Sequence, residues 1–124
     1  MVQLTWPQVL AFWVQRHFLE ERAARGSLPA VVSRICGLHA QVMSSAELAA
    51  WARIGGMDNG EVSVALWQER ILVKIWAMRW TLHLFSAVDF PLYLAAFRAF
   101  GYFRRETWLQ SVGLTADDMN ALLE

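Results

Sequence analysis

The tripeptide His39-Ala40-Gln41 places an imidazole and an amide two residues apart, just before an expected helix start. Free imidazole titrates near neutral pH, and a glutamine side chain offers both a donor and an acceptor. Such a pair could hold a water molecule and take a proton from it. The alternative is that both side chains are solvated or capping groups in a turn between two helices. The residues alone leave both interpretations open.

Several other chemistries lack their usual patterns. The sequence contains no Gly-rich phosphate loop, no CxxC pair and no HExxH motif, and its three histidines do not show metal-ligand spacing. We therefore expect neither a metal nor a cofactor. Lys74 is the only lysine and falls in an expected strand, which argues against a Schiff-base mechanism.

The composition predicts a folded protein with an unusually aromatic interior. Of the 124 residues, 56% are hydrophobic, which excludes a disordered chain. Either the seven tryptophans fill the core, or some rings face a partner that this chain does not contain. Apolar helical or strand stripes predict a core position for five of them, namely Trp6, Trp13, Trp51, Trp67 and Trp76.

Net charge, cysteine content and the length of apolar stretches indicate the cellular compartment. Eleven basic and eleven acidic residues cancel, so net charge gives no sign of nucleic acid. The single cysteine suits a reducing compartment, and no apolar stretch reaches the roughly 18 residues that a bilayer span needs. We expect a soluble, cytoplasmic protein.

Glycine, proline and capping residues divide the first half into helices. Thr5 and Pro7 are expected to start a helix that runs to about residue 24. Ser44 and Glu47 form a candidate capping box for a helix over 45–53. The remaining helices of this half are expected over 27–36 and 61–71.

The second half opens with β-branched and aromatic residues. These predict a two-stranded hairpin over 71–86 with a break near Met78. Helices are expected over 90–100 and 103–112, and a capping box at Thr115 starts a last one. A capped helix that begins so near residue 124 suggests that the chain is the front part of something longer.

Helices followed by a hairpin are the order of a winged helix-turn-helix. The expected fold is a winged helix-turn-helix of the α+β class, mainly α with a short β-hairpin. The expected division is a winged-helix domain over 1–88, with its wing near 71–86. A helical connection over 89–124 then leads into a truncated second domain.

Three segments raise this expectation, namely "LTWPQVLAFWVQRHFL", "GSLPAVVSRICGLHAQVMSSAELAAWARI" and "LVKIWAMRWTLHLFSAVDFPLYLAA". Together they resemble the N-terminal domain of the winged-helix DNA glycosylases, bacterial repair enzymes that excise alkylated bases, including antibiotic adducts and interstrand crosslinks. The resemblance implies a partner, double-stranded DNA with alkylated bases. It also implies that this is the first of several tandem winged-helix domains, the others being C-terminal domains of the same chain that are arranged around that DNA.

The same resemblance assigns a catalytic role to the HAQ tripeptide. In the family, a Gln-x-Gln or Gln-x-Asp pair stands here and is thought to hold a water against the anomeric carbon of the damaged nucleotide. Gln41 matches the second position, and His39 departs from the first. The implied reaction is hydrolysis of the N-glycosidic bond of an alkylated purine, by a monofunctional glycosylase.

Four further residues are candidates for DNA contact. The resemblance places Thr81 and His83 beside the site, although a structural hydrogen bond is an alternative role. Arg79 lies at the hairpin break and Lys74 lies nearby, where wings commonly touch phosphates. The alternative for the basic residues is a solvated face or an ion pair with a neighbouring glutamate. Trp80 stands where relatives usually have glycine, and its role is left open.

Two functions from different classes remain. The first is a DNA glycosylase, which would need its other domains to enclose DNA, so we do not expect activity from this chain alone. The second is a non-enzymatic winged-helix DNA-binding protein or an inactive fragment. The helix expected over 45–53 offers few side chains that read base edges, which argues mildly against the second.

Overall fold

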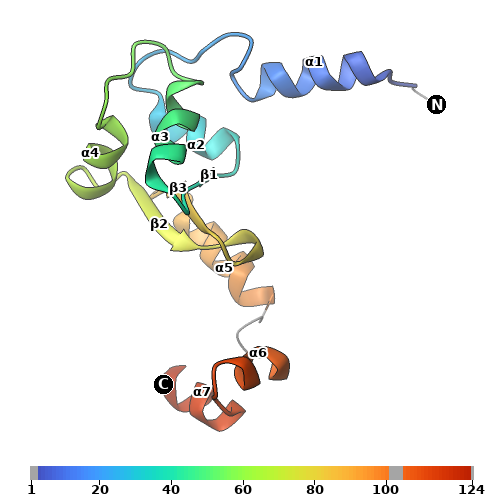
Figure 1. Cartoon of the computed structure of the whole chain (residues 1–124), viewed down its shortest axis with the longest axis vertical. Helices are drawn as coiled ribbons and strands as arrows, with labels where there is room; N and C mark the ends of the chain where they lie inside the picture. Colours follow the sequence, from blue (N-terminus) through green and yellow to red (C-terminus); the bar gives the residue numbers. More distant parts are fainter. Residues whose placement is uncertain (1–2, 101–104, 124) are drawn as a thin grey trace. The chain divides into compact units, whose positions relative to one another are not determined.

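The computed structural model of the chain describes residues 3–100 and 105–123. Two compact units divide it, Met1–Phe90 and Pro91–Glu124. The first unit contains these elements in chain order (Figure 1): α1 Trp6–Arg16, α2 Leu28–Arg34, β1 Leu38–His39, α3 Met43–Trp51, α4 Glu61–Trp67, β2 Leu72–Trp76, the 3₁₀ turn η1 Met78–Trp80, and β3 Leu82–Ser86. The structure is therefore a mixed α/β fold.

A small antiparallel sheet organises the first unit. Its strand order is β1-β3-β2, so β3 lies in the middle. The predicted hairpin is confirmed as β2 and β3, which pair from Leu72 opposite Ser86 to Trp76 opposite Leu82. The expected helix–helix turn around His39 is wrong, because Leu38 and His39 form β1 and pair with β3.

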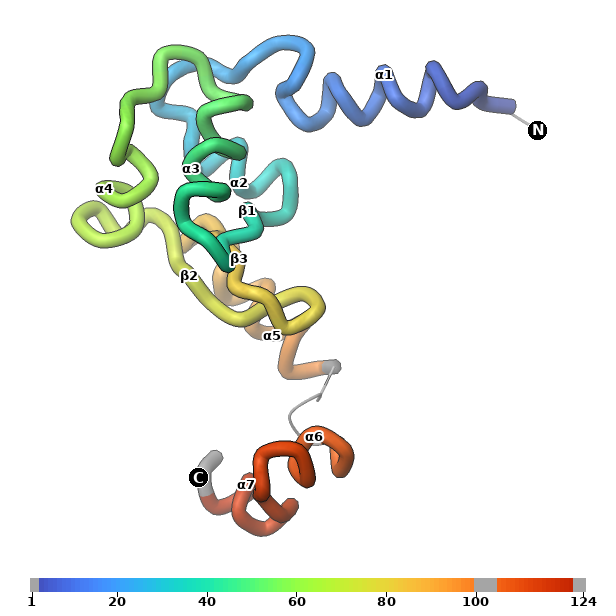
Figure 2. Tube along the Cα trace, in the orientation of Figure 1, coloured from blue at the N-terminus to red at the C-terminus, as the bar shows by residue number. Residues whose placement is uncertain are grey.

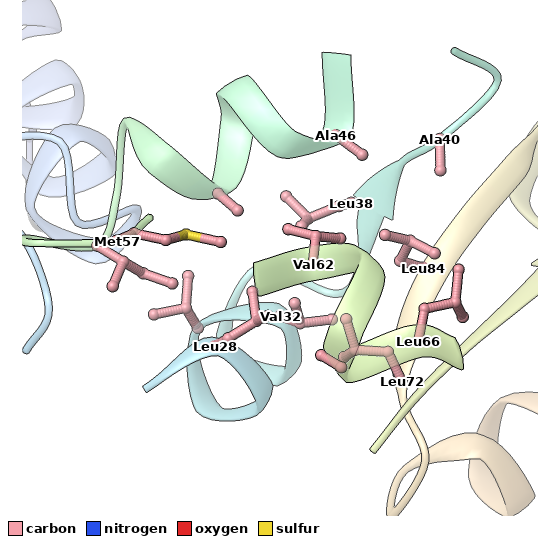
Figure 3. Packing of buried hydrophobic residues seen from close by; sticks show 14 residues of the cluster. Leu28, Val32, Leu38, Ala40, Ala46, Met57, Val62, Leu66, Leu72 and Leu84 are labelled. Atoms are coloured by element: carbon pink, nitrogen blue, oxygen red, sulfur yellow. The ribbon is translucent and has the colours of Figure 1, made fainter. Parts of the chain in front are cut away.

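The hydrophobic core lies between one face of this sheet and helices α2, α3 and α4 (Figure 3). Leu38, Leu72 and Leu84 supply the sheet side, and each is at most 3% exposed. Helix residues such as Val32 and Val62 pack against them and are fully buried. Side chains along each strand alternate between two faces, so the residues between these leucines and their neighbours lie on the opposite face of the sheet.

The first helix ends earlier than predicted. Gln8 Oε1 accepts a hydrogen bond from the Thr5 backbone N–H at 2.8 Å, which confirms the expected start. The helix stops at Arg16, because Phe18 adopts a left-handed backbone with φ of 56°. The chain then runs on to Ala23, which forms a parallel bridge with Ile54 (Figure 2). The last turns expected for the first helix are therefore replaced by an extended segment, in which Ala23 pairs with Ile54 after α3.

The capping box expected at Ser44 is also wrong. Helix α3 begins at Met43, with Val42 as its N-cap. Glu47 lies inside the helix, and its Oε1 accepts a hydrogen bond from Ser63 Oγ at 3.3 Å. The Glu47 carboxylate, which the local pattern assigned to a helix cap, therefore links α3 to α4 instead.

The five tryptophans that were expected in the core are exposed. Their exposed fractions run from 51% to 74%, for Trp6, Trp13, Trp51, Trp67 and Trp76. Helix α1 contains no buried residue, although most of its side chains are apolar. The core is instead built from leucine, valine and alanine, which the compact helix–sheet packing accommodates.

Replacing Trp13 with alanine is expected to change the free energy of unfolding by no more than about 0.5 kcal/mol, because half of the ring is already in water. Leu72→Ala is the matched control and should cost about 2–5 kcal/mol, because it leaves a cavity in the core. Urea unfolding followed by circular dichroism measures both. Equal losses would contradict the exposed position of α1.

The second unit consists of helices α5 Phe90–Phe100, α6 Glu106–Ser111 and α7 Ala116–Leu123, with Phe90 at the unit boundary. The prediction of a helix over 90–100 is confirmed. The helix expected over 103–112 partly lies outside the described residues, and α6 covers its remainder. The capping box at Thr115 is confirmed, because Asp118 Oδ2 accepts from the Thr115 N–H at 2.9 Å. Hydrogen bonds from Thr115 lower the pKa of Asp118.

Within the described residues, no helix combines the length and apolar character that a membrane crossing requires.

Candidate functional site

Gly37 lets the chain turn into β1 against β3. Its φ is 98°, in the left-handed region that favours glycine. A Cβ atom at this position would lie 2.8 Å from Phe85 Cε1 and 3.0 Å from the Leu84 carbonyl oxygen. The backbone before His39 can therefore approach the middle strand only because residue 37 has no side chain.

This approach brings two histidines together on the sheet. His39 is the register partner of His83 in β3. The centroids of their rings are 5.3 Å apart, and the ring planes meet at 88°. His39 is exposed, whereas His83 is only 8% exposed. The geometry offers one imidazole to solvent with a second packed edge-on behind it.

Hydrogen bonding fixes the tautomer of the inner histidine. His83 Nδ1 lies 2.8 Å from the Thr81 carbonyl oxygen. Because a carbonyl oxygen only accepts, Nδ1 carries the hydrogen and donates it, and Nε2 is the acceptor in the neutral ring. Phe85 stacks on the other side, with its ring centroid 6.0 Å away. Thr81 and His83 thus form a supporting layer beneath His39.

Gln41 is fastened to the sheet through its side chain. Its Oε1 accepts a hydrogen bond from the Leu82 backbone N–H at 3.1 Å, next to the bond from Ala40 N–H to the Leu82 carbonyl at 2.7 Å. A backbone N–H can only donate, so the atom facing it must be the amide oxygen. The side chain therefore continues the strand ladder after β1 ends. Within the described residues, the Nε2 group and the second lone pair of Oε1 form no hydrogen bond and are available to a ligand.

The sheet register separates the predicted site residues into two groups. His39 and Gln41 alternate with Ala40, which is fully buried in the core, so both lie on the outer side. Lys74 pairs with Leu84 and so shares the core-side face, opposite to the face of His83. The structure therefore brings four predicted residues together and places Lys74 elsewhere, the four being His39, Gln41, Thr81 and His83.

Arg79 lies at the tip of the hairpin. It is exposed, and both it and Trp80 have positive φ, of 56° and 57°. The Thr81 N–H donates to the Met78 carbonyl at 3.4 Å across these two residues. Positive φ at both central positions is typical of a type I′ turn, in which Asn-Gly is preferred. A left-handed backbone costs other residues about 1–2 kcal/mol each.

Sequence reasoning missed Gly37 and Phe85, which set how closely β1 approaches β3. Gly37 follows the helix expected over 27–36, where a glycine is typical of a helix C-cap. The alternation of Leu82, Leu84 and Ser86 with His83 and Phe85 was the available signal for two sheet faces. It marks Phe85 as the neighbour of His83 on the outer face.

Neither the apolar cavity beside α3 nor a metal-binding cluster adds a described residue to the site formed by His39, Gln41, Thr81 and His83. An apolar cavity of about 440 Å³ lies between α3 and the loop before α4, lined by Leu48, Trp51 and Met57 among others, and it includes none of the predicted site residues. Among the described residues, no three His, Cys, Asp or Glu side chains gather as a metal site would require.

Comparisons with known proteins identify the family of the chain. Residues 32–124 match the model of a family described as "DNA glycosylase AlkZ-like". The chain is 36% identical over 123 residues to an "Interstrand DNA cross-link repair glycosylase" of Streptomyces sahachiroi, covering 99% of this chain and 33% of that protein. The solved structure of the S. sahachiroi DNA glycosylase AlkZ superposes with a TM-score of 0.87, at 36% identity over 98% of this chain and 32% of that one. The chain thus spans about a third of the relative's length.

Proposed function

Because the chain belongs to the AlkZ-like DNA glycosylase family, we propose that it is the N-terminal part of a base-excising repair enzyme. In this proposal the unit with the sheet is a winged helix, with residues 1–88 as the first domain and 89–124 as the connection to a second. The order α2-β1-α3-α4-β2-β3 and the sheet order β1-β3-β2 support this, because they end in a two-stranded wing. Further domains would complete the grip on DNA.

The proposed substrate is a purine alkylated on a ring nitrogen, either as a single adduct or as one end of a crosslink. The name of the S. sahachiroi relative favours the crosslinked form. Such a base is cationic, so it leaves without being protonated first. When the N-glycosidic bond breaks, its electron pair goes to the base nitrogen and neutralises the base. What the protein must supply is electrostatic stabilisation of the sugar cation and a placed water.

The roles of the pair follow from their surroundings. Gln41 is held by Leu82 and would orient the water through its second oxygen lone pair or its NH₂ group. His39, exposed beside it, would accept the proton that the water loses as its oxygen bonds to the anomeric carbon. His83 supports the His39 ring from behind and needs no contact with substrate. The products are the free base and an abasic sugar.

The observation that carries the proposal is the convergence of His39 and Gln41 on the outer side of β1. Both side chains are exposed there, while the residue between them is buried. A surface pair that is positioned by a strand and backed by His83 is better placed for a ligand than a solvated turn would be.

The alternative of a non-enzymatic DNA-binding protein is disfavoured by α4, the helix that precedes the hairpin. Its sequence EVSVALW has only Glu61 and Ser63 as polar side chains. Glu61 accepts from Arg25 Nη2 at 2.8 Å, and Ser63 donates to Glu47. Neither is free for base-edge readout in the arrangement observed.

The test is release of 7-methylguanine, and unhooking of a crosslink, from duplex DNA. It uses this chain and, if the gene continues past residue 124, the longer product. His39→Ala should slow release about 100-fold, the lower end of the contribution of a general base. His17→Ala is the matched control, because that exposed histidine caps α1, away from the site in sequence and in element. No release by the longer protein, or equal loss in both variants, would overturn the proposal.

A further inference from the structure

The tip of the β2–β3 hairpin has a backbone that its residues do not favour. Arg79 and Trp80 occupy the two central positions of a turn with positive φ. Short residues such as Asn and Gly normally fill these positions, and a bulky residue there is a genuine outlier. Strained backbone of this kind is common at ligand-binding and active sites, where the side chain has a function other than forming the turn.

The side chains at the tip are large and accessible. Trp80 is 41% exposed and Met78 is 40% exposed, and Trp76 at the end of β2 is 56% exposed. The pairing of Trp76 with Leu82 closes the strand ladder immediately before the turn. The tip therefore exposes the indole of Trp80 and the thioether of Met78 at the end of the hydrogen-bonded strands β2 and β3.

The charge of the hairpin differs from that of the whole chain. From Ile71 to Val88 the sequence contains Lys74 and Arg79 but no Asp or Glu, although the chain as a whole has no net charge. In the part of the chain that the structure describes, the ion pairs are formed by Arg25, with Asp58 and Glu61. Among the described residues, Arg79 forms no ion pair with a glutamate, so the exposed guanidinium at the tip is suited to a polyanion.

We infer that the hairpin tip is a wedge for duplex DNA, with the indole of Trp80 against the bases and Arg79 on the phosphate backbone. This inference rests on the proposed function. Proteins that distort DNA insert apolar side chains between base steps, which partly unstacks the bases. An enzyme that must reach a glycosidic bond inside a duplex benefits from such distortion. The exposed guanidinium beside the indole favours a polyanionic partner, because arginine pairs with phosphate oxygens through charge-assisted hydrogen bonds.

Replacing Trp80 with glycine separates this role from a structural one. Glycine adopts positive φ without strain, so Trp80→Gly should leave the thermal midpoint unchanged or raise it. Its affinity for DNA should fall about tenfold, because base–aromatic stacking is lost. Trp80→Phe keeps a ring and should retain most of the affinity. Trp6→Ala is the control, because it removes an exposed tryptophan on α1 instead.

A second variant tests the arginine. Asparagine tolerates the left-handed region, so Arg79→Asn should preserve the turn. It should reduce the slope of log affinity against log salt concentration by about 0.9, the value for one lost phosphate contact. Fluorescence anisotropy of labelled duplexes, with and without a stable abasic-site analogue, gives both affinity and slope for this chain.

The outcomes are distinguishable. A Trp80→Gly protein that melts lower and loses affinity only in step with its unfolding would show a structural tryptophan and overturn the inference. Unchanged affinity in Trp80→Gly, with base release still dependent on His39, would overturn the wedge and leave the proposed function intact. A chain that binds no duplex at any salt concentration, and no release by the longer protein, would overturn both.

Discussion

Gly37→Ala should lower the free energy of unfolding of the first unit by about 2–5 kcal/mol. Two physical costs combine at this position. Alanine in the left-handed region costs about 1–2 kcal/mol, and crowding a packed site costs about 1–3 kcal/mol more. The crowding arises because the new Cβ would lie 2.8 Å from the fully buried Phe85 ring and 3.0 Å from backbone.

Gly26→Ala is the matched control for this prediction. Gly26 also has positive φ, of 82°, but no atom lies within 4 Å of its added Cβ. It should therefore show the conformational cost alone. Chemical denaturation of both variants measures the difference. Equal losses would mean that β1 does not approach β3 as closely as described. In the longer protein, Gly37→Ala should also reduce base release, because β1 carries His39.

Gln41→Ala is expected to reduce base release at least 100-fold while lowering the free energy of unfolding by only about 1 kcal/mol. The first effect follows from loss of the group proposed to hold the water. The second follows from loss of one exposed hydrogen bond, to the Leu82 N–H. Single-turnover release assays and urea unfolding measure the two effects on the same preparations.

Gln41→Glu is the conservative variant that should preserve both roles. A carboxylate can accept from the Leu82 N–H and still offer an oxygen to water. This variant should keep its stability and retain release to within about tenfold. If Gln41→Ala lost stability but released base at the normal rate, the side chain would serve the strand alone, and the proposed water-holding role would fail.

Much of the element order could be predicted from local signals. Glycine and proline marked most helix boundaries, and the run of β-branched and aromatic residues over 71–86 predicted the hairpin. These signals worked because backbone preference and burial agreed there. The helix over 90–100 was predicted to the residue for the same reason.

The third strand could not be predicted, because two residues carry no periodicity. Leu38 and His39 become a strand only through pairing with β3, which lies more than 40 residues later in the chain. The candidate site depends on that pairing. The sequence therefore singled out His39 but did not predict the strand that carries it.

The tryptophans show a different limit. An apolar stripe predicts that a face will be covered, but it does not say by what. Helix α1 has such a stripe without a buried residue, so periodicity alone mistook an uncovered face for a core face. The smaller side chains of α2, α3 and α4 made a closed core without any of these rings.

The unequal anchoring of His39 and Gln41 has a consequence for how such a site can diversify. The side chain of Gln41 forms part of the sheet, so exchanging it alters the scaffold as well as the chemistry. His39 makes a ring contact with His83 but no side-chain hydrogen bond within the residues described. Mutational drift can therefore sample new groups at position 39 at little cost to folding. A histidine in place of the expected glutamine is the kind of exchange that this freedom permits.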